Sequence, residues 1–229
     1  MISPRALLMD LDGTLADTAA DLAGALNRLL AEEGLPQVKT SDIRSVASDG
    51  SRALLRVGFG LRPEDPDYGE YQERLLAHYR ERIADETRLF AGMSELLAAI
   101  HRYDLPWGVV TNKPSWLTEP LMKKLKPTPR PGCVISGDTV RRAKPYPDPL
   151  FLAAARLDVP TGHCLYVGDA ARDVEAARSA GMPVVVAGWG YLPRTSPPDE
   201  WNADQIFDSP GALQTWLIEQ LDRDADNAR

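Results

Sequence analysis

Two aspartates near the start of the chain, Asp10 and Asp12, are the residues best suited to chemistry. They stand in the run Asp-Leu-Asp-Gly-Thr, directly after an apolar segment. Side chains two residues apart on an extended segment project to the same side, so the two carboxylates can share one task. At ordinary residue usage the pattern Asp-x-Asp-Gly-Thr is expected on the order of once in 10^5 positions. We therefore interpret it as a functional motif.

A calcium-binding loop of the EF-hand type is the first alternative for this pair. In that loop the glycine would fall two residues later than Gly13, and the closing glutamate is absent here. A purely structural role in capping a turn would explain one carboxylate, but not two beside further motifs. The pair is better explained by a reaction or by a different metal site.

Three later segments also carry polar side chains suited to chemistry. One comes directly after an apolar run, one precedes a proline, and one follows another apolar run with two aspartates four residues apart. Aspartates at that spacing lie on one face of a helix start. The residues are Thr111 and Asn112, then Lys144, then Asp169 and Asp173.

These segments need a scaffold that brings them together. A short, largely apolar run predicts a strand at 5–11, and similar runs, mostly of β-branched residues, predict strands at 107–111, 133–136, 165–168 and 183–187. Amphipathic stretches between them predict helices at 93–103, 115–125, 149–157 and 170–180. Alternating strands and helices predict an α/β fold with a doubly wound, Rossmann-like parallel sheet, whose ligands bind beyond the carboxyl ends of the strands.

Residues 16–85 interrupt this alternation. They contain helical patterns and no convincing strand. One apolar stripe is formed by Leu22, Leu26, Leu29 and Leu30, and a second helix rich in charged residues is expected from Tyr71 to Ile83. We interpret this segment as a small helical cap inserted after the first strand.

Composition excludes several classes of function. The formal net charge is -7, from 33 acidic and 26 basic residues, which disfavours binding to nucleic acid. No apolar run is long enough to cross a membrane, and Asp10 and Asp12 interrupt the first apolar stretch, so we expect no signal peptide and a cytoplasmic protein without a membrane partner. Nothing in the sequence predicts an oligomeric state.

The cysteines and histidines indicate no zinc site and no disulfide. Cys133 and Cys164 are far apart in the chain and each begins an apolar stretch, so buried, reduced thiols are expected. The histidines show no metal-ligand spacing with one another or with a cysteine pair; they are His78, His101 and His163.

The four motifs in this order resemble those of the haloacid dehalogenase-like hydrolases. Within that superfamily the chain is similar to the phosphoglycolate phosphatase-like branch, which has a helical cap. The resemblance spans nearly the whole chain and implies a catalytic core of residues 1–15 and 86–229 and a cap of residues 16–85.

The resemblance implies a magnesium-dependent phosphatase acting on a small-molecule phosphate ester. Asp10 would attack phosphorus, because an aspartate with a pKa of about 3.9 is already an anion at neutral pH. Asp12 would donate a proton to the leaving group and then take one from water. The Lys144 ammonium would offset the negative charge of the phosphate. The predicted Mg²⁺ ligands are Asp10, Asp12, Asp169 and Asp173.

Four residues are predicted to bind the substrate. The Thr111 hydroxyl and the backbone near Asn112 would hold a phosphoryl oxygen. Lys113 would attract the anion, although a solvated lysine is an equal alternative. Arg52, in the predicted cap, would bind a substrate carboxylate, with a solvated arginine as its alternative. Asp173 has an alternative role as an ordinary helix cap.

Two other functions stay open at the sequence level. A sugar-phosphate mutase of the same superfamily would return the phosphoryl group to a sugar, but the last motif of such mutases resembles Glu-Asp-Ser-x-Ala-Gly, unlike residues 168–173 here. A non-catalytic binding protein could share the fold. For the phosphatase, the segments 106–114 and 188–208 are similar to N-acetylmuramic acid 6-phosphate phosphatases, while the general pattern also suits phosphoglycolate phosphatases.

Overall fold

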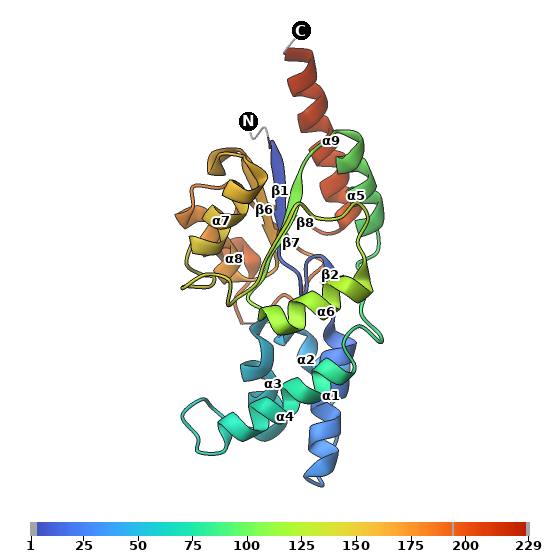
Figure 1. The fold of residues 1–229 in the computed structure, drawn as a ribbon, viewed down its shortest axis with the longest axis vertical. Coiled ribbons are helices and arrows are strands. Elements are labelled where there is room, and N and C mark those ends of the chain that lie inside the picture. The colour runs from blue at the N-terminus through green and yellow to red at the C-terminus, as the bar shows by residue number, and fades with distance from the viewer. Residues whose placement is uncertain (1–3, 194, 228–229) are drawn as a thin grey trace.

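The computed structural model describes residues 4–193 and 195–227 and contains a six-stranded sheet with the strand order β5-β4-β1-β6-β7-β8 (Figure 1). Every neighbouring pair in this sheet is parallel. The prediction of an α/β fold with a parallel sheet is confirmed. The strands are β1 (Ala6–Met9), β4 (Trp107–Val110), β5 (Cys133–Ile135), β6 (Cys164–Gly168), β7 (Val184–Ala187) and β8 (Gln205–Phe207).

Helices cover both faces of the sheet because its strands are apolar on both sides. In β1, Leu7 and Met9 join one core cluster, while Ala6 and Leu8 join the other. This alternation follows from the two-residue repeat of a strand. Helices α5 (Met93–Arg102), α6 (Ser115–Leu125) and α9 (Pro210–Asn227) contribute to the first cluster, and α7 (Asp148–Leu157) and α8 (Ala171–Ser179) to the second.

A group of helices lies at one end of the sheet, at the bottom of Figure 1. It consists of α1 (Ala19–Glu32), α2 (Thr40–Arg44), α3 (Gly50–Phe59) and α4 (Tyr68–Glu81), with a 3₁₀ turn at Ala47–Asp49. The leucine stripe of α1 is buried, as its helical spacing predicted. We call these helices the cap. The limits of the cap at residues 16–85 remain a prediction. The ends of the predicted core, residues 1–3 and 228–229, lie outside the described residues.

Four elements differ from the sequence prediction. The short strand β2 (Ala16–Asp17) pairs with β3 (Arg88–Leu89) in an antiparallel ribbon, so the expectation of no strand within residues 16–85 was wrong. Two-residue strands are too short to show a repeat, and this ribbon forms where the chain enters and leaves the cap. Strand β8 and helix α9 were not predicted either.

Two further expectations can be compared with the described residues. Cys133 and Cys164 are both buried and free, as predicted. Among the described helices, none is both long enough and apolar enough to cross a membrane. Two more short 3₁₀ turns complete the described elements, at Thr161–His163 and Pro198–Glu200.

Candidate active site

Asp10 follows β1 directly and is 3% exposed. Its Oδ1 accepts a hydrogen bond from the Leu11 amide at 2.7 Å. The chain then turns sharply at Gly13, which has φ +83°. A Cβ atom at Gly13 would lie 2.0 Å from an oxygen of Asp169, so only glycine lets this turn approach the last motif so closely.

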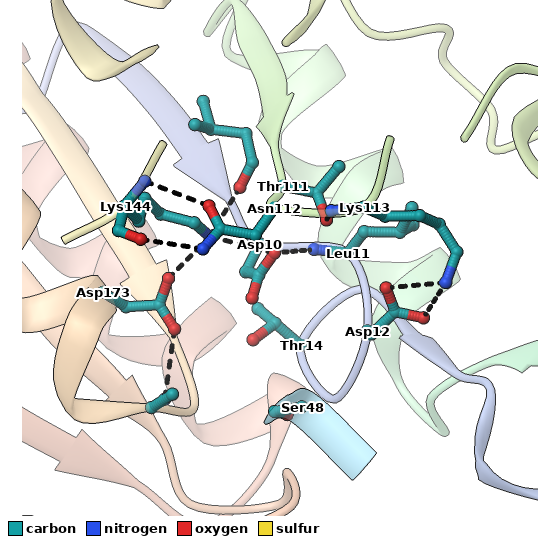
Figure 2. Close-up of polar contacts among 12 residues, drawn as sticks. Asp10, Leu11, Asp12, Thr14, Ser48, Thr111, Asn112, Lys113, Lys144 and Asp173 are labelled. Carbon is teal, nitrogen blue, oxygen red and sulfur yellow. Dashed lines mark hydrogen bonds and ion pairs between the residues drawn. The ribbon is translucent and has the colours of Figure 1, made fainter. Parts of the chain in front are cut away.

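Lys144 connects the first and last motifs. Its fully buried ammonium lies 3.0 Å from Oδ1 of Asp10 and 2.7 Å from Oδ1 of Asp173 (Figure 2). It also donates to the Val110 carbonyl at 2.8 Å and to the Tyr166 hydroxyl at 2.9 Å. A buried ammonium is stable only when charge and hydrogen-bond partners surround it. The structure therefore places Lys144 beside Asp10.

The side chain of Asn112 holds the Lys144 backbone in place. Its Nδ2 donates to the Lys144 carbonyl at 2.8 Å, and its Oδ1 accepts from the Lys144 amide at 3.0 Å. This pair of bonds joins the loops after β4 and β5. The neighbouring Thr111 is buried, and its hydroxyl oxygen accepts a hydrogen bond from the Lys113 amide at 3.1 Å.

Three buried carboxylates converge on one point. One oxygen from each of Asp10, Asp169 and Asp173 lies within 4.8 Å of the others. Asp169 accepts hydrogen bonds from the Ser48 hydroxyl at 2.7 Å and the Tyr191 amide at 2.9 Å. Asp173 also accepts from the Ala170 amide at 3.1 Å, so its alternative role as a helix cap is real and coexists with its contact to Lys144.

Burial and mutual repulsion make two of these carboxylates, Asp169 and Asp10, hold protons more strongly than usual. Burial, followed by the charges of Asp10 and Asp173, raises the pKa of Asp169 to about 7. Burial also raises the pKa of Asp10 to about 6, although the Lys144 ammonium opposes the shift. A divalent cation bound by oxygen ligands would relieve this repulsion, so the residues fit a metal site.

The Asp12 carboxylate lies outside this group. Figure 2 shows it turned toward Lys113, whose ammonium donates to its two oxygens at 2.9 and 3.0 Å. Its Oδ1 also accepts from the Thr18 hydroxyl at 2.6 Å. Lys113 is 7% exposed in its side chain, so the alternative of a solvated lysine does not describe it. The geometry separates Asp12 from the carboxylates that could share a cation.

A cleft of about 1000 Å³ opens between the core and the cap, and it is lined by the predicted residues Asp10, Asp12, Arg52, Thr111, Asn112 and Lys113. From the core it is lined by Asp10, Asp12 and residues 111–114, and from the cap by residues 45–53 among others. Arg52 lines the cleft and is exposed. The other predicted site residues, Lys144, Asp169 and Asp173, do not line the cleft but lie next to Asp10, which does.

The sequence analysis missed two residues that join the cap to the core. Arg172 donates to the Asp49 carboxylate at 2.7 Å and to the Ser48 carbonyl. Its position between Asp169 and Asp173 in the last motif was a signal for a role in the site. Ser48 contacts Asp169, and its place four residues before the predicted Arg52 was its sequence signal.

Comparison with known proteins agrees with this arrangement. The family model described as haloacid dehalogenase-like hydrolase matches residues 7–187. The chain belongs to this family. It is 41% identical over 210 residues to an N-acetylmuramic acid 6-phosphate phosphatase of Pseudomonas putida, with 92% of this chain and 94% of the relative covered. It is 40% identical over 210 residues to a phosphoglycolate phosphatase of Xanthomonas campestris, covering 92% and 95%.

A solved structure with a similar fold also aligns with nearly the whole chain. CbbY from Rhodobacter sphaeroides, in complex with phosphate, aligns with a TM-score of 0.72 at 25% identity and covers 93% of this chain and 96% of its own. The predicted resemblance to haloacid dehalogenase-like hydrolases is confirmed. Phosphatases of this family generally use a divalent metal, and the cluster of Asp10, Asp169 and Asp173 offers the ligands for one.

Proposed function

We propose that this chain is a magnesium-dependent phosphatase that hydrolyses a small phosphate ester through an aspartyl-phosphate intermediate. The observation that carries the proposal is the position of Asp10. Its carboxylate borders the cleft, contacts the Lys144 ammonium and shares a point with two further buried carboxylates. The similar proteins named as phosphatases support the same reaction.

In the first step, an Asp10 oxygen attacks phosphorus. The bond between phosphorus and the ester oxygen breaks, and its electron pair stays on that oxygen. Asp12 is proposed to give this oxygen a proton, so that an alcohol leaves. The Thr111 hydroxyl and the amides near Asn112 are proposed to hold the phosphoryl oxygens, because they lie in the loop that borders the cleft.

In the second step, water attacks the phosphorus of the aspartyl-phosphate. Asp12 takes a proton from the water, the bond between phosphorus and the Asp10 oxygen breaks, and inorganic phosphate leaves. The electron pair returns to Asp10 as a carboxylate. Each group then has the charge and protons with which it began, so the cycle is complete.

Asp10, Asp169 and Asp173 would hold the Mg²⁺ ion. When bound, the ion supplies positive charge that offsets repulsion between Asp10 and an incoming phosphate. The Lys144 ammonium acts in the same direction from the other side of Asp10. Asp12 was also predicted as a ligand, but its contacts with Lys113 and Thr18 favour the proton-transfer role.

The leaving group of the substrate is proposed to carry a carboxylate. N-acetylmuramic acid 6-phosphate and phosphoglycolate both do, and the cap wall of the cleft presents Arg52 to such a group. Because a relative named as an N-acetylmuramic acid 6-phosphate phosphatase is among the most similar proteins, we favour that compound. The two buried free thiols suit a reducing compartment, and we propose that the enzyme works in the cytoplasm.

Release of inorganic phosphate tests the function. Purified protein is expected to hydrolyse p-nitrophenyl phosphate with Mg²⁺ and to lose that activity after the metal is removed by a chelator. A panel of phosphate esters, compared by kcat/KM, then ranks the substrates. Absence of phosphate release from every ester, with Mg²⁺ present and the protein folded, would exclude a phosphatase. Interconversion of two phosphosugars in place of release would identify a mutase.

A further inference from the structure

The contacts of Lys113 differ from those of a lysine that attracts substrate from solution. Its ammonium donates to both oxygens of Asp12, at 2.9 and 3.0 Å. Only 7% of the Lys113 side chain and 13% of the Asp12 side chain are exposed. Burial by itself would lower the pKa of Lys113, but the Asp12 charge outweighs it and raises that pKa, so the ammonium stays charged.

The cap supplies the other wall around this ammonium. The Tyr79 ring of α4 is buried, and its centroid lies 4.7 Å from the Lys113 Nζ. An ammonium over an aromatic face is attracted by the ring electrons, and the attraction is stronger where water is excluded. Lys113 is therefore held between a residue of the core and a residue of the cap.

The two oxygens of Asp12 differ in their surroundings. Oδ1 accepts from the Thr18 hydroxyl at 2.6 Å and from Lys113. Oδ2 accepts from Lys113 at 3.0 Å, and Asp12 lines the cleft. A carboxylate oxygen has two lone-pair directions, so Oδ2 is the oxygen with more capacity to accept a proton from a water molecule in the cleft.

We propose that Lys113 is a positioning residue that acts on the reaction through Asp12, and that Tyr79 of the cap holds Lys113 in place. The inference rests on the proposed phosphatase function. It concerns the second step, in which water gives a proton to Oδ2 of Asp12 while its oxygen bonds to phosphorus and the Asp10 oxygen departs. With its carboxylate fixed by Lys113, Asp12 enters this step already oriented.

A double-mutant cycle separates this role from substrate attraction. The variants are Lys113→Met, Asp12→Asn and the combination of both, assayed with p-nitrophenyl phosphate and Mg²⁺. The p-nitrophenolate leaving group of this ester departs readily without a proton donor. Asp12 is therefore needed chiefly for the second step, in which water attacks the aspartyl-phosphate. If Lys113 acts through Asp12, Lys113→Met lowers kcat by about tenfold in the wild-type background. In the Asp12→Asn background it changes kcat by less than about twofold, because the partner is already lost.

A direct contact between Lys113 and the substrate gives a different pattern. Lys113→Met would then raise KM by a similar factor in both backgrounds with kcat little changed, and the inference would be overturned. An increase in kcat in Lys113→Met would also overturn the inference, because the ammonium would then slow the proton transfer to Asp12. A wild-type protein that releases no phosphate from any ester would instead overturn the proposed function itself.

Two tyrosine variants test the part played by the cap. Tyr79→Leu removes the ring and is expected to lower kcat, as Lys113→Met does, but by a smaller factor. Tyr79→Phe keeps the ring and is expected to restore kcat to within about twofold of wild type. Equal losses in both variants would exclude the ring as the support of Lys113. Lys123→Met, at an exposed position on α6, is the matched control for a removed lysine.

Discussion

The two walls of the cleft are built differently. On the core side, Lys144 and Asp173 are completely buried in their side chains, and Lys144 alone has four polar partners. On the cap side, Arg52 is exposed and the contacts to the core pass through single side chains such as Ser48. A rigid buried network can hold reacting groups in place, whereas exposed side chains can change without disturbing the fold. The comparison indicates that the buried network of the core holds the reacting groups, and that the exposed side chains of the cap select the ester.

Replacing Asp10 is expected to have the largest effect. Asp10→Asn keeps the shape of the side chain but removes the nucleophile, and turnover of p-nitrophenyl phosphate should fall by at least about 10^4-fold. The measurement is phosphate release by the purified variant, with circular dichroism to confirm that it is folded. Full activity in a folded variant would show that the reaction does not depend on the core wall in the way we propose.

Removing the Lys144 ammonium should reduce both activity and stability. Lys144→Met leaves Asp10 and Asp173 buried without their counter-charge, so kcat should fall by about 10^2 to 10^3-fold. The free energy of unfolding should fall by about 3 to 5 kcal/mol, measured by denaturant titration.

Arg142 gives a matched control for Lys144 in the same loop. It pairs with Asp148 at the surface, with 54% of its side chain exposed. Arg142→Met should change the unfolding free energy by no more than about 1 kcal/mol. Similar losses in the two variants would contradict the distinction between buried and exposed contacts.

A change in the cap wall should alter selectivity and leave the chemistry intact. Arg52→Ala is expected to raise KM for carboxylate-bearing esters by about tenfold while kcat and KM for p-nitrophenyl phosphate stay unchanged. Arg62→Ala, at an exposed position of the cap outside the lining of the cleft, is the control. An equal change for both kinds of ester would place Arg52 outside substrate recognition.

The smallest expected effect concerns the connection between cap and core. Burial by itself would raise the pKa of Asp17, but hydrogen bonds from Arg44 and Tyr191 outweigh it and hold that pKa below its ordinary value of 3.8. A lowered carboxyl pKa stabilises the folded state above the unfolded pKa, and this contribution is lost as pH falls through the lower, folded value.

Asp17→Asn should therefore be less stable than wild type near neutral pH. The difference in Tm between wild type and variant should shrink as pH falls from about 5 to about 3. Asp85→Asn removes a carboxylate whose pair with Lys124 is exposed, and it should show a smaller difference at every pH. A difference in Tm that is independent of pH would exclude the charge of Asp17 as its source.

The local chain chemistry was enough to predict five of the six strands of the sheet, most of its helices and the aspartates that converge. Short apolar strands that alternate with amphipathic helices can form few arrangements other than a parallel sheet covered by helices. Parallel strands bring their carboxyl ends to one edge of the sheet. The meeting of Asp10 with Asp169 follows from that topology. The ribbon of β2 and β3 did not follow, because two residues carry no periodic signal and the partners are far apart in the chain.

What the sequence by itself determined was therefore the fold class and the set of candidate reactive side chains. Only the tertiary structure decided their partners: Lys144 beside Asp10, Lys113 on Asp12, and Ser48 of the cap on Asp169. The physical reason is that residue type and spacing determine at which end of which strand a side chain lies. The direction in which a long or flexible side chain turns depends on charges and on burial supplied by segments more than 100 residues away, as for Lys113 and Asp12.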